Sequence, residues 1–469
     1  MASRFLHPAL FRFIILASVC LVSVGQSAPA AEWMKRQAEV SRVKLLQNVS
    51  APGAARGSVV ASPSKANPDY FYHWVRDAGL VMEVVVNLYR ASRTKEEKAY
   101  YFQTLVDFIR FSRKNQLTKT LAGLGAPKFH ADGSAFNGPW GRPQNDGPAL
   151  RAIALIKLAR VWLAEGQEKL VRELLYDSKG DSQTVLKVDL EFVSHNWQVA
   201  CFDLWEEIKG DHFYTRLAQR RALIEGARLA YQLGDRGAAD WYLKNGRAME
   251  ASINAHWDGA RRVIVPTLNR TGGIDYKSSG LDVSVILGVL HATGSDRFFS
   301  FSDSRVLSTF HRLETMFDKL YPVNLKKSYP AVAIGRYPED RYDGDGFSGG
   351  NPWVLATVGF GEFLHRLAAE YEQIGHIQLD GGNVGFFQSI GLKSVQKTHF
   401  QKGDRVFEAL VERIRVRGDA FIARAGFHAL KDGSFSEQID QHTGFMRGAP
   451  NLTWSHASFL TAFWSRGER

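Results

Sequence analysis

A helical period that recurs along almost the whole chain is the feature that most constrains its fold. Apolar residues return at intervals of three and four over residues 80–93, 98–114, 147–165, 213–233, 237–257, 305–320, 352–374 and 403–424. Strand-like alternation is scarce, and residues 263–265 form one short candidate. We expect about twelve helices in all, and no shift in composition marks a linker between them.

An all-α domain with that many helices has few possible architectures. A four-helix bundle uses too few of them. An open solenoid would show a sequence repeat of ~20–50 residues, and we find no such self-similarity. A closed ring of helical hairpins fits better, because its connecting loops gather around a pocket at one end.

Charge and composition exclude several classes of partner. The formal net charge of +11 would suit an anionic partner, but lysines and arginines alternate with acids, as in residues 93–98, and no nucleic-acid motif occurs. We therefore expect no nucleic-acid partner. Paired-histidine zinc motifs, a complete calcium loop and a dinucleotide loop are missing as well, so we expect no metal and no cofactor.

The N-terminus predicts a cleaved secretory signal over residues 1–30. Arg4 and Arg12 supply positive charge, residues 13–24 are apolar, and Ala28-Pro29-Ala30 offers a small-residue cleavage site. The apolar run is too short to span a bilayer comfortably. We expect a secreted protein, without a membrane anchor in its mature form, whose catalytic domain covers residues 31–469.

Two acidic segments suggest the chemistry. Glu206 and Glu207 end the segment 203–207, and Glu437 lies in 436–438 beside Phe435. Both segments have aromatic residues and glycines nearby. Two carboxyl groups in an aromatic pocket suit hydrolysis of a glycosidic bond, since one protonates the leaving oxygen while the other deprotonates water.

Five blocks make the chain recognisable. They are residues 70–80; 123–129 with 138–151; 203–207; 336–340 with 351–353; and 435–438 with 451–455. In these blocks, and in their order, the chain closely resembles the glucoamylases of glycoside hydrolase family 15. The match extends over residues 70 to 460, nearly all of the expected mature protein.

The resemblance implies a single catalytic domain folded as an all-α (α/α)6 barrel. It also implies an inverting, exo-acting enzyme that releases β-glucose from the non-reducing ends of α-1,4-glucans. Glu206 would be the general acid, Glu437 the general base, and Tyr70 would orient the base. Sugar-contacting residues would be Arg76, Asp77, Trp140, Leu204, Trp205, Glu207, Arg336, Trp353 and Trp454. We expect Glu206 to lie beside Trp205, partly shielded from water.

Some alternatives stay open at this point. A relative with the same fold could act on another α-glucosidic linkage, such as α-1,6 in dextran or the bond in trehalose. A non-catalytic carbohydrate-binding protein is a further alternative, although the presence of both glutamates argues against it.

We expect the partner to be an α-glucan oligo- or polysaccharide, and we expect the protein to be a monomer. Loop 341–350 looks longer than in fungal enzymes, and we expect no starch-binding module.

Overall fold

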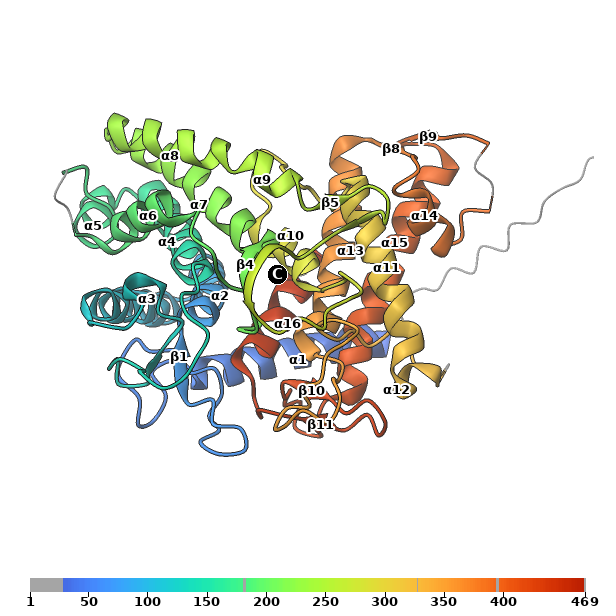
Figure 1. Ribbon diagram of the computed structural model, residues 1–469, viewed down its shortest axis with the longest axis horizontal. Helices are drawn as coiled ribbons and strands as arrows, with labels where there is room; N and C mark the ends of the chain where they lie inside the picture. Colours follow the sequence, from blue (N-terminus) through green and yellow to red (C-terminus); the bar gives the residue numbers. More distant parts are fainter. Residues whose placement is uncertain (1–27, 180–182, 327, 394–395, 468–469) are drawn as a thin grey trace, which may run out of the picture.

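The computed structural model describes residues 28–179, 183–326, 328–393 and 396–467 (Figure 1). Within these ranges, twelve helices have nine or more residues, as the sequence pattern predicted. They are α1 (Ala28–Gln47), α2 (Val75–Ala91), α3 (Lys95–Leu117), α4 (Asp146–Ala164), α6 (Val185–Asn196), α7 (Phe213–Gln232), α8 (Arg236–Ala248), α10 (Ser284–Ala292), α11 (Ser304–Leu320), α13 (Val354–Ile374), α15 (Arg405–His428) and α16 (Thr453–Ser465). Shorter helices are α5 (Glu168–Leu174), α9 (Glu250–Asn254), α12 (Pro322–Leu325) and α14 (Val384–Ser389). Residues 1–27 of the predicted signal lie outside the described residues.

Six of the long helices form a closed inner ring. Each packs against the next in the order α2, α4, α7, α10, α13 and α16, and α16 closes the ring on α2. The other six lie outside, each against an inner partner: α1 on α16, α3 on α2, α6 on α4, α8 on α7, α11 on α10 and α15 on α13. Figure 1 shows two of these pairs side by side, α7 with α8 and α13 with α15. The predicted (α/α)6 barrel is thus confirmed.

The share of buried residues differs between inner and outer helices. Along α10 every residue except His291 is buried, because the helix packs against neighbours in the ring and against the outer layer. On the outer helix α8, by contrast, only Ala239, Tyr242 and Gly246 are buried. None of the described helices is long and apolar enough to cross a membrane.

Strands are short and lie in the loops. The predicted strand at 263–265 is present as β6 (Val263–Ile264), paired with β5 (Trp257–Asp258). Three further sheets concern the site: β1 (Tyr72–Trp74) with β2 (Lys128–His130); β4 (Ile208–His212) between β3 (Cys201–Phe202) and β7 (Thr267–Gly273); and β10 (Gln438–Ile439) with β11 (Met446–Arg447). A last pair joins β8 (His376–Gln378) to β9 (His399–Gln401). Pairs this short fix loops rather than form a layer.

One buried ion pair ties an inner helix to an outer one. Arg151 of α4 donates two hydrogen bonds to the carboxylate of Asp189 on α6, at 2.7 and 2.6 Å. Their side chains are 3% and 0% exposed, and Gln116 at the end of α3 donates to the same carboxylate at 2.9 Å. The three-way contact therefore joins three helices around a carboxylate that is 0% exposed.

Replacing Arg151 with Met should destabilise the barrel strongly, because it leaves the carboxylate of Asp189 buried without its cation. Loss of one partner of a buried pair typically costs about 3–5 kcal/mol. Urea denaturation followed by circular dichroism measures the effect. The control is Arg36→Ala on α1, whose ion pair with Glu32 is mostly exposed and should contribute about 0–1 kcal/mol. Equal losses in the two variants would contradict this account of Arg151.

Candidate active site

The predicted site segments lie just before the first residues of inner helices. Residues 70–74 precede α2, 140–145 precede α4, 203–212 precede α7, 336–353 precede α13, and 437–452 precede α16. Inner and outer helices alternate along the chain, so each outer helix returns the chain and all inner helices run in the same direction. Their N-terminal ends consequently lie at the same end of the barrel, and the segments meet there.

A tight turn between β3 and β4 presents Glu206. The carboxylate of Asp203 accepts the backbone N–H groups of Glu207 and Ile208 at 2.8 and 3.0 Å. Glu206 itself has a φ of +68°, in the left-handed region that a non-glycine residue rarely adopts. The turn is therefore held by Asp203 in a conformation that fixes the direction of the glutamate side chain.

The carboxylate of Glu206 receives hydrogen bonds from four side chains. Three donate to Oε1: Trp74 Nε1 at 2.8 Å, Gln144 Nε2 at 3.0 Å and Arg76 Nη2 at 3.3 Å. Trp140 Nε1 donates to Oε2 at 2.6 Å. The donors come from two segments, 74–76 and 140–144, so the position of this carboxylate depends on the assembled barrel.

Trp205, the residue before Glu206, donates its indole N–H to Asp282 at 2.9 Å. The indoles that donate to the acid itself are those of Trp74 and Trp140. The side chain of Glu206 is 15% exposed, so it is partly shielded from water. Trp205 packs against Trp353, with ring centroids 5.5 Å apart, and so forms another wall of the same region.

Glu437 lies in a buried, closely packed position. It is 1% exposed, and its backbone carbonyl accepts the N–H of Val354, the first residue of α13. A Cβ placed on Gly448 would come within 2.6 Å of its Oε2 atom, and that glycine has a φ of +72°. Only a glycine leaves room for the carboxylate at this point.

Burial raises the pKa of Glu437 to about 8. Hydrogen bonds from Tyr70, Gln438 and Tyr342 and the charge of Arg336 act in the opposite direction, since each favours the ionised form. The Gln438 amide donates at 3.1 Å, and the hydroxyls of Tyr70 and Tyr342 share a hydrogen bond of 2.9 Å. Tyr70 thus contacts the carboxyl that it was predicted to orient.

A short chain of contacts links the two glutamates. The Tyr70 hydroxyl lies close enough to Glu437 to lower the pKa of its carboxyl, and the Tyr70 ring lies 5.5 Å from that of Trp74. Trp74 in turn donates to Glu206. The two carboxyl groups, 231 positions apart in sequence (437 − 206), therefore lie at the same end of the barrel and are linked through two aromatic side chains.

Glu207 is held by a second charged cluster. Arg336 Nη2 donates to its Oε1 at 2.9 Å, and the hydroxyl of Tyr337 donates to its Oε2 at 2.7 Å. Arg336 also forms a two-pronged contact with Asp340, at 2.8 and 2.5 Å. The ammonium of Lys277 lies 3.5 Å from Glu207. Burial nevertheless raises the pKa of Glu207, while Arg336 and Lys277 oppose the rise.

Arg76 and Asp77 occupy the first turn of α2. The guanidinium of Arg76 donates to Asp146 at 2.9 Å and to Gln144 at 3.0 Å, besides its contact with Glu206. Burial raises the pKa of Asp77 to about 6, against the opposing charge of Arg76. Arg76 therefore links Glu206 to the start of α4, and Asp77 lies next to it.

The remaining predicted residues lie on or just beneath this end of the barrel. Trp353 forms an isolated bridge with Gln438, next to Glu437, and its ring lies 6.3 Å from that of Tyr342. Leu204 is buried in the main core below the β3–β4 turn. Trp454, at the start of α16, packs its ring 5.8 Å from His291 of α10, on the inner wall of the barrel.

Several residues of the site were missed by the sequence analysis. Trp74, Gln144 and Asp340 lie inside the recognised blocks, and Asp340 follows Arg336 by four positions, so inspection of the blocks could have found them. Lys277 and Asp282 lie outside every block. Only the folded chain brings Lys277 within 3.5 Å of Asp203 and Glu207 and 3.2 Å of Asp282.

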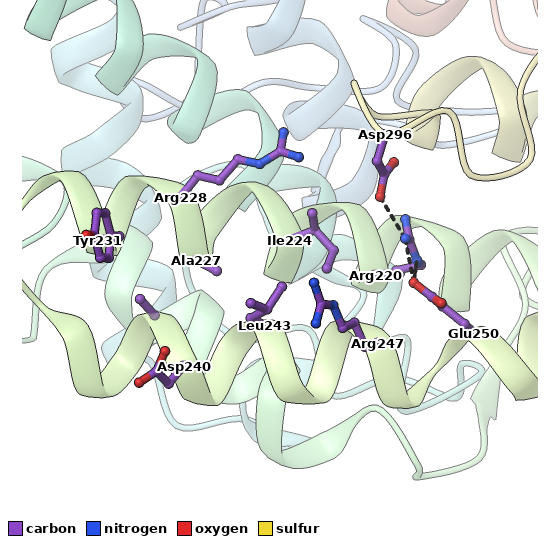
Figure 2. A pocket seen from close by; sticks show the side chains of 11 residues that line it. Arg220, Ile224, Ala227, Arg228, Tyr231, Asp240, Leu243, Arg247, Glu250 and Asp296 are labelled. Atoms are coloured by element: carbon purple, nitrogen blue, oxygen red, sulfur yellow. Dashed lines mark hydrogen bonds and ion pairs between the residues drawn. The ribbon is translucent and has the colours of Figure 1, made fainter.

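A groove between an inner and an outer helix is separate from this site (Figure 2). It runs between α7 and α8 and contains none of the predicted residues. Arg220 bridges Glu250 and Asp296 at one end of it, at 2.7 Å to each. These contacts tie α7 to α9 and to the loop after α10.

Comparisons with known proteins agree with the geometry. The family model described as glycosyl hydrolases family 15 matches residues 37–464. A glucoamylase of Blastobotrys adeninivorans is 40% identical over 456 residues, covering 93% of this chain and 72% of that protein. An intracellular sporulation-specific glucoamylase of Saccharomyces cerevisiae is 32% identical, covering 94% and 85%. The solved glucoamylase structure from Saccharomycopsis fibuligera superposes with a TM-score of 0.84 at 31% identity, covering 93% and 95%.

The chain belongs to the glycosyl hydrolases of family 15. It is a hydrolase of the glucoamylase type.

The raised pKa of Glu437 should make the stability of the protein depend on pH. Between the unfolded value of about 4.3 and the folded value of about 8, the native state binds more protons than the unfolded state, so the free energy of unfolding falls as pH rises. Glu437→Gln removes this cost. We expect the variant to be more stable than the parent near pH 7.5, by a few kcal/mol on the order that such a shift implies, and no more stable near pH 4.

Thermal unfolding at several pH values measures this difference. The control is Glu32→Gln, at a glutamate whose side chain is 61% exposed; its difference from the parent should not change with pH. If the Glu437→Gln difference is also constant, Glu437 titrates as an ordinary carboxyl group.

Proposed function

We propose that Glu206 and Glu437 are the general acid and general base of an exo-acting glucan 1,4-α-glucosidase. The enzyme hydrolyses α-1,4-glucans from their non-reducing ends and releases β-glucose. The observation that carries this proposal is the meeting of two glutamates from distant turns at one end of the barrel, connected through the aromatic side chains of Tyr70 and Trp74. The family match supplies the substrate class.

The roles follow from the position of each glutamate in the blocks that resemble the family. Glu206 protonates the glycosidic oxygen, and Glu437 takes a proton from the attacking water. After each turnover the base holds a proton and the acid is ionised. The environment of the base matches that state, because burial raises the pKa of Glu437 and so favours its proton. Return of the proton to Glu206 then precedes the next cycle.

The other predicted residues would hold sugars around this pair. Glu207 and Arg336 form one polar wall and Arg76 with Asp77 another, so donors and acceptors for hydroxyl groups are available on both sides. Trp140, Trp205, Trp353 and Trp454 would supply flat surfaces for the sugar rings.

Localisation is also part of the proposal. We infer that the protein is exported by the signal predicted in residues 1–30 and acts as a monomer. One relative is named as intracellular, so homology alone does not decide the compartment. Mass spectrometry of the N-terminus of protein recovered from the medium, with sedimentation equilibrium, tests both points; recovery only from inside the cell would refute export.

A substrate panel tests the function directly. Maltose, maltooligosaccharides and soluble starch should be hydrolysed far faster than isomaltose or trehalose, and proton NMR should show β-glucose as the first product. Preference for isomaltose or trehalose would support the alternative of another α-glucosidic linkage. Initial α-glucose would mean retention and would exclude the proposed roles of the two glutamates. Binding of maltooligosaccharides without any hydrolysis would identify a carbohydrate-binding protein.

Replacing Glu206 with Gln should lower kcat by about 10²–10⁴-fold, because the amide cannot donate a proton to the leaving oxygen. Substrate binding should persist, since the amide keeps the size of the carboxylate. Steady-state kinetics on maltotriose measure both parameters. Glu250→Gln, in the outer groove of Figure 2, is the control and should leave kcat unchanged. A Glu206→Gln variant with near-parental activity would assign the acid elsewhere.

A further inference from the structure

Lys128 occupies an unusual position for a lysine. It lies on β2 directly opposite Trp74 of β1, and it is only 3% exposed. Its ammonium group lies over four aromatic rings, with distances from Nζ to the ring centroids of 3.3 Å for Trp140, 4.2 Å for Phe136 and 4.5 Å for both Tyr72 and Trp74. We call these four aromatic residues the lysine cage.

The lysine cage is closed on itself. Ring centroids are 6.0 Å apart between Tyr72 and Trp74, 6.2 Å between Trp74 and Trp140, 5.9 Å between Trp140 and Phe136, and 5.4 Å between Phe136 and Tyr72. Among the described residues, no side chain or backbone group forms a hydrogen bond or ion pair with the ammonium. The rings are therefore its main partners, through cation–π attraction.

Two walls of the lysine cage are the residues that hold the general acid. Trp74 donates its indole N–H to one oxygen of Glu206, and Trp140 donates to the other. A cation over an indole ring draws electron density toward itself and makes the N–H a stronger donor, because neighbouring polar interactions polarise one another. The cation also holds the two rings at a fixed mutual angle. Lys128 thus acts on both oxygens of Glu206 without touching either.

We propose that Lys128 is a positioning residue for the general acid, acting on Glu206 through the indoles of Trp74 and Trp140. This inference deepens the proposed function and depends on the role given there to Glu206. Tyr72 and Phe136 complete the lysine cage around the ammonium.

The other charged groups around Glu206 determine how much the ammonium of Lys128 contributes to the electrostatics of the acid. Arg76 of α2 contacts the carboxylate directly, and Asp77 and Asp146 lie beside that arginine. From the side of β2, the charges that act on Lys128 are Glu206, Asp69 and Arg142. Burial lowers the pKa of Lys128 to about 8, so the side chain is cationic at neutral and acidic pH. It is the second cation facing the acid, after Arg76.

Lys128→Met tests the proposal, since the thioether keeps the length of the side chain and packs well against aromatic rings. We expect kcat on maltotriose to fall by about 10–10²-fold, as for small misplacements of a catalytic group, with little change in KM. The alkaline limb of the pH profile should move to higher pH, because loss of a nearby cation favours the protonated acid. Lys128→Arg keeps the charge and should restore most of kcat and the parental limb.

A measurement independent of activity separates this inference from the proposed function. In protein labelled with ¹⁵N-tryptophan, the indole N–H resonances of Trp74 and Trp140, assigned through Trp→Phe variants, should move upfield in Lys128→Met as their hydrogen bonds weaken. The matched control is Lys244→Met on α8, whose ammonium lies 5.9 Å from the ring of Trp241, far from the site in sequence and on the outer layer. Lys244→Met should leave kcat, the alkaline limb of the pH profile and the two indole resonances unchanged.

The outcomes of these experiments decide whether Lys128 positions Glu206. If Lys128→Met keeps the parental kcat, alkaline limb and indole shifts, the lysine only fills space and the proposal is wrong. If wild-type enzyme gives α-glucose or no hydrolysis, the proposed function fails, while the indole shifts still report whether Lys128 positions Glu206. Should Lys128→Met not fold, Phe136→Leu opens the lysine cage without touching Glu206 and should shift the same resonances in the same direction. Unshifted resonances in that variant would overturn the proposal.

Discussion

The alternation of inner and outer helices is the constraint on which the site depends. Every outer helix carries the chain back, so all six inner helices start at the same end of the barrel. The loops before them are where the chain can differ without disturbing the packed ring. The positive ends of the helix dipoles also point to this end and favour carboxylates there. Asp77 and Asp146, in the first turns of α2 and α4, are buried at such positions.

Burial of so many charged groups requires that they be paired. The end of the barrel where the inner helices begin holds the acids Asp77, Asp146, Asp203, Asp282, Asp340, Glu206, Glu207 and Glu437, and the cations Arg76, Lys128, Lys277 and Arg336. Most of the acids contact a cation directly, which offsets the cost of removing them from water. Glu437 differs, because its contacts are hydroxyl and amide groups and Arg336 acts on it only from a distance. Burial is therefore the largest influence on the pKa of Glu437.

Sequence reasoning recovered the barrel because long helices carry their own signal. A helix such as α13 repeats its apolar period over several turns, so it can be predicted from the sequence without tertiary context. Strand pairs of two or three residues carry no such period, and β1 with β2 could not be predicted from pattern. Within the blocks, local order suggested Arg76, Glu206 and Glu437, yet it did not indicate that the indoles donating to Glu206 are those of Trp74 and Trp140. Which side a turn residue faces depends on a backbone angle that the sequence does not state.

The two glutamates are positioned by opposite physical means. Glu206 lies on a strained turn residue and is directed by hydrogen bonds from Trp74, Trp140, Gln144 and Arg76, so its geometry depends on polar groups that must all be in place. Glu437 is fixed by close packing, with Gly448 against one of its oxygens and the start of α13 against its backbone. A proton donor must follow the leaving oxygen, whereas a base must leave space for one water. A network of directional hydrogen bonds suits the first requirement, and a rigid, tightly packed wall suits the second.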